Sequence, residues 1–420
     1  MENNHREVLL KVDHLCQYFR LGRKDMKAVD DVSFEVMKGE AFGLVGESGC
    51  GKTTTGRSII KLYNITSGNV YFKGERVSAG TRAYKDAITE ARTDASKNIK
   101  KLRSEKNVSD SRKLEIQKEI KKINEDLAAV VEKNRTLIKE AKSESKDVDK
   151  RYVEKLLREL EAEYAEKFSA AKGNDEQIKA LKKEYNDRCR VAKKSRLITR
   201  IQMIFQDPIA SLDPRMTVRD IIAEGLVING ITDKEYINEK VYEILEMVGL
   251  VREHADRYPH EFSGGQRQRI GIARAIIMQP EMIIADEPIS ALDVSIQAQV
   301  INLLNDLRER LGLTIMFIAH DLSVVKYFSD RIGVMHFGKM VELADSEELF
   351  KNPLHPYTKS LLSAIPLPDP VYEKQRTRIL YNPIAEHDYS VDKPSFREIT
   401  PGHFVYCNDA EEAKYKQQVK

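Results

Sequence analysis

The sequence has few cysteines, no long hydrophobic run and almost no net charge, and each shortage excludes a class of protein. Its four cysteines are scattered over 420 residues without a CxxC pair, which argues against a disulfide framework or a zinc ribbon and favours a reducing, cytoplasmic compartment. The longest apolar stretches, residues 282–285 and 313–319, are far shorter than the ~20 residues that cross a bilayer, so we expect no transmembrane helix. The first ten residues lack a basic region followed by an apolar run, so we expect no secretory signal. A net charge of +3 gives no general reason to expect nucleic-acid binding.

Charge is concentrated in one segment, residues 83–196, which holds 54 charged residues among its 114. The segment has no proline and a single glycine, Gly173, so little in it breaks a helix. Apolar residues recur there at spacings of three and four, the stripe of a solvated coiled-coil helix. They are Ile116, Ile120, Ile123, Leu127, Val130, Val153, Leu157, Leu160, Tyr164, Ile178, Leu181 and Tyr185. We expect two long antiparallel helices with a turn at the polar residues 142–150 and an interruption near 171–175; the alternative is a charged, partly disordered loop.

Outside this segment, short apolar runs alternate with helical stretches, which predicts an α/β fold with a parallel sheet. The expected strands are residues 41–45, 201–205, 282–285 and 314–318, and the expected helices are 52–61, 265–278 and 296–311. Residues 29–36 and 69–77 alternate apolar and polar side chains, as half-exposed antiparallel strands do. Several prolines follow residue 352, which indicates a docked C-terminal extension without a core of its own. The expected division is 1–82 and 197–350 for the two parts of one domain, 83–196 for an insertion and 351–420 for the extension.

The strongest motif is GESGCGKTT at residues 46–54, which matches GxxxxGK[ST] between an apolar strand and a helical stretch. Its glycines allow backbone N–H groups to surround phosphate oxygens, its lysine supplies a charge to the β- and γ-phosphates, and its first threonine can bind Mg²⁺. Cys50 serves here as a small residue whose alkylation should disturb ATP binding. The expected ATP-binding residues of this loop are Gly46, Glu47, Ser48, Gly49, Cys50, Gly51, Lys52, Thr53 and Thr54.

Two carboxylates, Asp286 and Glu287, directly follow the apolar run at residues 282–285. The end of a buried strand is where α/β proteins bind ligands, so Asp286 is suited to hold Mg²⁺ through water and Glu287 to orient the attacking water. Taken alone, such a pair is more often a helix cap. Next to a phosphate loop, the catalytic interpretation is favoured.

A second glycine turn, FSGGQ at residues 262–266, offers a second place for an anion at a helix start. One chain has no need of two phosphate-binding turns so far apart in sequence. A dimer does, if the turn of each chain closes over the nucleotide bound to the other.

With these motifs the chain resembles the ATP-binding subunits of ABC transporters. The resemblance implies an ABC-type P-loop ATPase core with an antiparallel β subdomain and a helical subdomain, here with an inserted antiparallel coiled-coil hairpin. It makes FSGGQ the signature motif, whose Ser263, Gly264, Gly265 and Gln266 act in trans on the ATP of a partner.

Four further positions match this family. Gln206 in MIFQDP corresponds to the glutamine loop, which senses the γ-phosphate, contributes to the Mg²⁺ site and touches the membrane subunits. Asp293 in SALD matches the loop that crosses the dimer interface, and His320 in IAHD matches the switch histidine at the γ-phosphate. Tyr18 or Phe19 would stack on adenine, and we favour Phe19.

The segment NPLHPYTKSLLSAIPLPDP at 352–370 resembles the C-terminal region of peptide-importer ATPases of the F type. This implies an ATPase that drives oligopeptide uptake from the cytoplasmic side of the cell membrane, as a peripheral protein, with ATP and Mg²⁺. The implied partners are a second ATPase subunit of the D type, two transmembrane permease subunits and an extracytoplasmic peptide-binding protein, with no nucleic acid. Many relatives carry a cysteine cluster after this segment; only Cys407 lies there, so we expect no iron–sulfur cluster.

The insertion leaves its own role and one alternative function open. Its 31 basic and 23 acidic residues favour contact with anionic lipid or an acidic partner, but an inert spacer fits equally well. DNA-maintenance ATPases also combine these motifs with coiled coils, but they place the coil between the glutamine loop and the signature, whereas here it precedes Gln206. A ribosome-associated regulator with tandem cassettes would need two phosphate loops, and this chain has one.

Overall fold

The computed structural model describes residues 7–22, 24–105, 109–172, 174–290, 292–365 and 378–419. Several residues discussed above therefore lie outside the described residues: residues 1–6 of the N-terminal stretch, Gly173, Ala291 of the SALD motif, and residues 366–370 of the peptide-importer segment. None of the helices in the described ranges has a stretch of sufficient length and hydropathy to serve as a membrane span.

An antiparallel sheet forms the N-terminal part of the molecule. Its order is β2-β1-β4-β5, with β1 (Val8–Leu21), β2 (Lys24–Met37), β4 (Ser67–Phe72) and β5 (Glu75–Thr81). The expected strand 29–36 lies within β2. The expected single strand 69–77 is wrong: Lys73 and Gly74 both have positive φ, and they turn the chain so that β5 pairs back on β4.

An eight-stranded mixed sheet forms the centre, in the order β11-β12-β10-β9-β3-β8-β7-β6. The strands are β3 (Ala41–Val45), β6 (Ile201–Ile204), β7 (Met282–Asp286), β8 (Thr314–Ala319), β9 (Arg331–His336), β10 (Lys339–Asp345), β11 (Ser395–Thr400) and β12 (His403–Cys407). The strands from β9 through β6 are parallel, which confirms the four strands expected for a parallel sheet. Strand β3 is buried on both faces: Phe42 and Leu44 join one hydrophobic cluster, and Ala41 and Val45 join the other.

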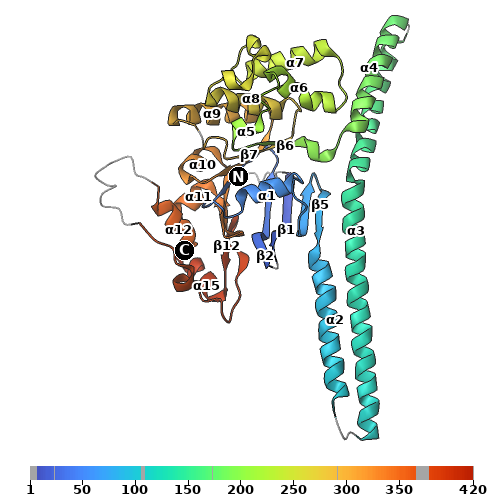
Figure 1. The fold of residues 1–420 in the computed structure, drawn as a ribbon, viewed down its shortest axis with the longest axis vertical. Helices are drawn as coiled ribbons and strands as arrows, with labels where there is room; N and C mark the ends of the chain where they lie inside the picture. The colour runs from blue at the N-terminus through green and yellow to red at the C-terminus, as the bar shows by residue number, and fades with distance from the viewer. Residues whose placement is uncertain are drawn as a thin grey trace.

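Helices cover the central sheet, and α6, α7 and α8 gather at one end of it (Figure 1). The three expected helices are present as α1, α8 and α9, with ends displaced by one or two residues. The core helices are α1 (Lys52–Ile59), α5 (Pro208–Ser211), α6 (Val218–Ile228), α7 (Lys234–Met247), α8 (Gly264–Ile276), α9 (Val294–Leu311) and α10 (Leu322–Phe328), with short 3-10 turns at Leu197–Arg200, Arg252–Asp256 and Pro259–Glu261.

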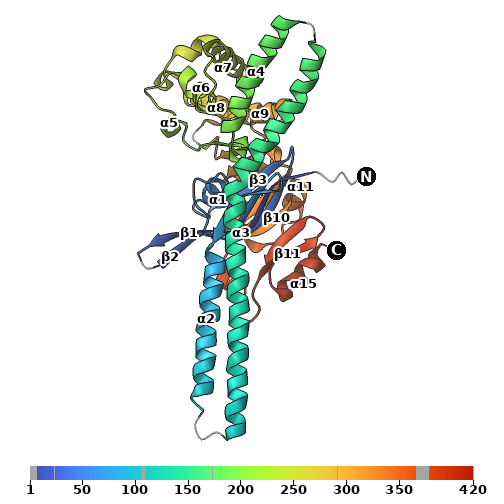
Figure 2. The same cartoon turned by 90° about the vertical axis from the view of Figure 1, so that its right-hand side faces the viewer.

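The charge-rich segment forms three helices, α2 (Arg82–Arg103), α3 (Asp110–Ala170) and α4 (Asp175–Lys194). Helix α3 has 61 residues, roughly 90 Å, and it runs the length of the molecule with α2 beside its first half and α4 beside its last part (Figures 1 and 2). The break between α3 and α4 falls at the expected interruption. The expected turn at 142–150 is wrong, because these residues lie inside α3.

Contacts with the core domain explain why this polar stretch is helical. Val148 is buried in the core cluster beneath the antiparallel sheet. Glu144 forms an ion pair with Arg76 at 3.3 Å, and the Asp149 carboxylate accepts the Leu197 N–H at 3.1 Å. Val148 and these two contacts attach the stretch to the core domain, while most of its polar side chains remain exposed. The stretch is therefore a continuous helix docked on the core domain and not a turn.

Helix α11 (Ser346–Lys351) leads into the C-terminal extension. In its described residues the extension contains α12 (Pro356–Ser363), α14 (Pro383–Glu386) and α15 (Asp409–Gln418) together with strands β11 and β12. It is docked as expected, since β12 pairs with β10 of the central sheet. The expectation that it has no core of its own is wrong, because Leu354, Ile399, Val405, Cys407 and Tyr415 form a small buried cluster.

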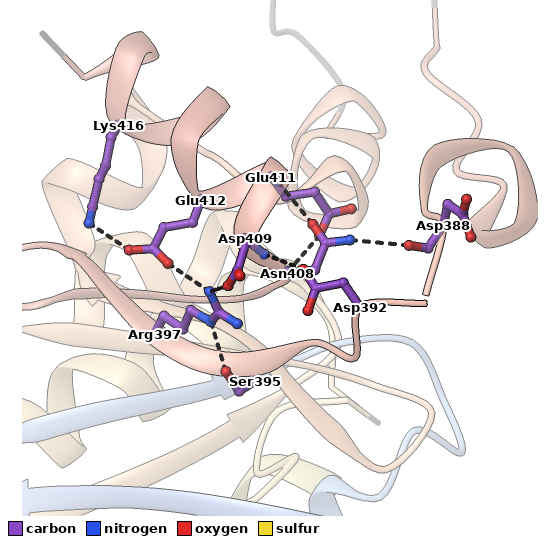
Figure 3. Close-up of polar contacts among 9 residues, drawn as sticks. All are labelled: Asp388, Asp392, Ser395, Arg397, Asn408, Asp409, Glu411, Glu412 and Lys416. Carbon is purple, nitrogen blue, oxygen red and sulfur yellow. Dashed lines mark hydrogen bonds and ion pairs between the residues drawn. The ribbon is translucent and has the colours of Figure 1, made fainter. Parts of the chain in front are cut away.

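Ion pairs fasten helix α15 to strand β11 (Figure 3). Arg397 on β11 contacts Asp409 and reaches Glu412 at 2.7 Å, and Glu412 also accepts from Lys416 at 2.5 Å. Asn408 caps the helix in a reciprocal pair with Glu411. The end of the chain is therefore part of one connected unit with the central sheet.

Candidate nucleotide-binding site

The chemistry-bearing residues follow strands that point the same way. Because β3, β6, β7 and β8 are parallel, their carboxyl ends meet at one edge of the sheet. The phosphate loop follows β3, Gln206 follows β6, the Asp286–Glu287 pair ends β7, and His320 follows β8. Sheet topology alone thus brings four segments together that are up to 274 residues apart in sequence.

The phosphate loop has the backbone that its glycines allow. Gly46, Gly49 and Gly51 have φ values of 147°, 81° and 108°. A Cβ atom on Gly46 would lie 2.2 Å from the Met335 carbonyl oxygen, so only glycine fits at this position. The ammonium of Lys52 donates to the carbonyl oxygens of Gly46 at 2.7 Å and Glu47 at 2.9 Å. The loop therefore closes around a buried positive charge.

The start of helix α1 adds a second attraction for an anion. Its N-cap is Gly51, which has no side chain to accept from the first helical N–H groups. Glu47, Ser48 and Gly49 are exposed at the rim of the loop. Cys50 is buried, and burial raises the pKa of its thiol against the opposing effect of Lys52. Free amides, a helix start and an ammonium are the features that bind phosphate.

Thr53 and Asp286 form the part of the site that could hold a magnesium ion. The Thr53 hydroxyl donates to Asp286 Oδ1 at 2.7 Å, while Asp286 Oδ2 is buried and has no hydrogen-bond partner in the described structure. Burial raises the pKa of this carboxyl. A hydroxyl and an unpartnered carboxylate oxygen are ligands that Mg²⁺ prefers, so these residues fit the ion. Gln206, the third expected ligand, contacts Glu287 in this structure.

The Glu287 carboxylate contacts the residues that follow two other strands, β6 and β8. Its Oε2 atom accepts from Gln206 Nε2 at 2.9 Å and lies 3.2 Å from His320 Nδ1. Its backbone has a φ of 45°, unusual for a residue with a side chain, and its N–H donates to the Ile318 carbonyl at 2.9 Å. A cavity of about 70 Å³ lies between Glu287 and His320. The structure therefore joins all three residues expected to be catalytic around one carboxylate oxygen.

The signature turn forms the capped start of helix α8. Ser263 and Gln266 form a capping box at the start of α8: the Ser263 hydroxyl accepts the Gln266 N–H at 3.3 Å, and Gln266 Oε1 accepts the Ser263 N–H at 3.0 Å. Gly264 is exposed, and a Cβ atom on Gly265 would lie 2.6 Å from Ile296, so packing against α9 requires glycine there. Asp293, also exposed, precedes α9 without a side-chain cap bond.

The signature turn and the phosphate loop are not joined within one chain. Across the described ranges, no hydrogen bond or ion pair links residues 262–266 or Asp293 to residues 46–54. The phosphate loop and the signature turn are therefore separate local structures within the described residues.

The two candidate adenine-stacking residues differ in what already contacts them. Tyr18 donates its hydroxyl to Asp30 at 2.5 Å, and its ring lies against Lys27 and Arg82. Phe19 makes an edge contact with Tyr63, with ring centroids 5.2 Å apart. The polar contacts of Tyr18 leave Phe19 as the better candidate.

Two contacts to the phosphate loop were missed in the sequence. The Glu47 N–H donates to the hydroxyl of Tyr357 at 3.1 Å, and the Gly338 N–H donates to the Cys50 carbonyl at 2.9 Å. The only sequence signal for Tyr357 was the HPYT segment, which we interpreted as a family marker and not as part of the site.

Two family models match the chain. The model described as ABC transporter matches residues 29–176 and 155–290, and the model described as oligopeptide/dipeptide transporter, C-terminal region, matches residues 341–393. Together with the parallel sheet and the strand-end site, these matches define the ATP-binding cassette of an ABC transporter.

Relatives with similar sequences identify the type of ABC transporter cassette. The chain is 48% identical over 407 residues to the oligopeptide transport ATP-binding protein OppF of Bacillus subtilis, covering 96% of this chain and 98% of that protein. It is 42% identical to OppF of Streptococcus mutans, covering 99% of both chains, and 41% identical to AmiF of Streptococcus pneumoniae, covering 98% of both. The chain belongs to the OppF-type family of oligopeptide transport ATP-binding proteins.

Proposed function

We propose that this chain is the ATP-hydrolysing subunit of an ABC importer and that it couples ATP binding and hydrolysis to the uptake of oligopeptides. The observation that carries the proposal is the convergence of Gln206 and His320 on one oxygen of Glu287, at the same sheet edge as the phosphate loop. The OppF-type relatives supply the substrate class.

In this proposal the loop binds ATP through its amides and Lys52, and Phe19 stacks on the adenine. Thr53, Asp286 and Gln206 would hold Mg²⁺, which would neutralise charge on the phosphates when bound. The unpartnered Asp286 oxygen supports this assignment, because a buried carboxylate oxygen is stable only with a partner.

Hydrolysis is assigned to Glu287. Its carboxylate accepts a proton from water as the water oxygen bonds to the γ-phosphorus, the bond to the β-phosphate oxygen breaks, and ADP and phosphate are released. Gln206 fixes the orientation of the carboxylate, and His320 donates to the γ-phosphate oxygens as charge develops. The contacts of Gln206 and His320 with Glu287, at 2.9 and 3.2 Å, support these two roles.

The site is completed by a second ATPase subunit. Ser263, Gly264, Gly265, Gln266 and Asp293 of one subunit would close over the ATP of the other, since these residues are separate from the loop of their own chain. The partner we propose is a D-type paralogue. Two permease subunits and a peptide-binding protein complete the complex and place this chain on the cytoplasmic face of the membrane.

The proposal includes no iron–sulfur cluster. Burial raises the pKa of Cys407 to about 12, which disfavours the thiolate that a cluster binds. No group of three or more potential metal ligands occurs among the residues that the structure describes.

We keep the division into a core at 1–82 and 197–350, an insertion at 83–196 and an extension at 351–420. In the insertion, α2 and α4 each pack antiparallel on α3 as short coiled coils. Support comes from the buried cluster of Leu160, Tyr164 and Ala192 between α3 and α4. The insertion ends before β6, so it does not separate Gln206 from the signature turn as a DNA-maintenance coil would.

Reconstitution of the complete transporter tests the proposal. Proteoliposomes containing the two permease subunits, both ATPase subunits and the peptide-binding protein should take up a labelled oligopeptide only with Mg-ATP, and the peptide should stimulate phosphate release. Uptake without ATP, or ATP-stimulated binding of this chain to duplex DNA that weakens with added salt, would contradict it.

A further inference from the structure

The C-terminal extension reaches the phosphate loop through one hydroxyl. Tyr357, in the first turn of α12, accepts the Glu47 N–H at 3.1 Å across a sequence separation of 310 residues. The tyrosine is 2% exposed and Glu47 lies at the exposed rim of the loop, so the hydrogen bond is partly buried.

The loop and Tyr357 rest on the same strand end. The His336 ring, at the end of β9, packs on the Tyr357 ring with centroids 4.0 Å apart. The carbonyl oxygen of the residue before it, Met335, lies 2.2 Å from the position that a Cβ atom on Gly46 would take. Strand β9 therefore fixes the separation between the tyrosine ring and the start of the loop.

Buried hydrogen bonds fix the position of Tyr357 from the other side. Glu342 on β10 is fully buried and accepts the N–H groups of Leu354 at 2.7 Å and His355 at 3.0 Å, and His403 of β12 lies 2.8 Å from the same carboxylate. The Tyr357 N–H in turn donates to His355 Nδ1 at 3.1 Å. Burial lowers the pKa of His355 to about 3, so this nitrogen remains an acceptor at neutral pH.

We propose that Tyr357 is a positioning residue for ATP binding: its hydroxyl holds the first peptide of the phosphate loop in the phosphate-binding conformation. The inference rests on the proposed function, because it assumes that the loop binds ATP. The loop has three residues at positive φ, so its bound shape is one of many open to a glycine-rich segment. A partner that fixes the Glu47 amide before ATP arrives lowers the ordering cost of binding, and the extension thereby sets the affinity of the site.

The test replaces Tyr357 by phenylalanine, which removes the hydroxyl and keeps the ring. In the full-length chain, Y357F should weaken the Kd for Mg-ATP by about three- to tenfold, the range expected for one lost hydrogen bond. In the assembled transporter, the KM for ATP should rise by a similar factor while kcat stays within about twofold. A raised KM with an unchanged kcat distinguishes this effect from misfolding, because a partly unfolded preparation would lower kcat and leave KM unchanged.

Tyr389 supplies the matched control. It lies in the same extension, and its hydroxyl makes partly buried hydrogen bonds to His387 at 2.8 Å and Glu411 at 3.2 Å, without a hydrogen bond to the loop. Y389F should therefore bind ATP as the parent chain does. An unchanged KM in Y357F, or an equal rise in Y389F and Y357F, would overturn the inference. The proposed function fails separately, if the parent chain itself does not bind Mg-ATP.

Discussion

Replacing Glu287 by glutamine is expected to lower the rate of ATP hydrolysis by about 100- to 10,000-fold while ATP binding persists. The amide has nearly the same shape as the carboxylate but cannot accept a proton from the attacking water. Gln206 and His320 now contact the Glu287 oxygen at 2.9 and 3.2 Å, and both can still contact an amide oxygen there. Steady-state phosphate release by the assembled transporter measures the first effect, and the Kd for Mg-ATP measures the second.

Glu281, directly before strand β7, offers a control for Glu287, which directly follows the same strand. It pairs with Lys73 at 2.8 Å and lies at the end of the strand opposite the phosphate loop. E281Q removes an equal charge from the protein and should leave turnover within about twofold. If E287Q hydrolysed ATP near the parent rate, Glu287 would not be the base.

Replacing Lys52 by methionine should weaken the Kd for Mg-ATP by about ten- to a hundredfold. The methionine keeps the length of the side chain but loses the ammonium, which would otherwise make charge-assisted hydrogen bonds with the phosphates. It also leaves the Gly46 and Glu47 carbonyls without the donor at 2.7 and 2.9 Å that now shapes the loop. Equilibrium binding of Mg-ATP to the full-length chain gives the result directly.

The matched change is Lys11 to methionine, on the exposed face of the antiparallel sheet, where the ammonium pairs with Glu35 at 2.7 Å. K11M lowers the net charge by the same amount without touching the loop. The role given to Lys52 would be wrong if the two variants bound ATP equally well.

The central sheet and its site could be predicted from sequence because each part has a local signal. Strands such as Met282–Asp286 are short apolar runs buried on both sides, and a polar residue directly after one must lie at the sheet edge. The glycines of the phosphate loop and the capping pair Ser263–Gln266 can likewise be recognised within segments of fewer than ten residues. The sheet topology then brings these segments to one site, since parallel strands have their carboxyl ends at the same edge.

Two of the errors arose where the partner of a residue lies far away in sequence. Glu144 and Asp149 looked like turn residues because polarity was equated with solvent, but their partners are Arg76 and the Leu197 amide of the core domain. Tyr357 has no local feature that reveals its contact with Glu47. Such pairings depend on the fold as a whole and become visible only in the structure.

The most direct measurement is the rate of ATP hydrolysis per chain as a function of its association with the second ATPase subunit. Light scattering would establish which samples contain only monomers. We predict negligible hydrolysis by the monomer and full rates only when a second subunit places its serine–glycine turn over the bound nucleotide. A monomer that hydrolysed ATP as fast as the complete transporter would contradict the account.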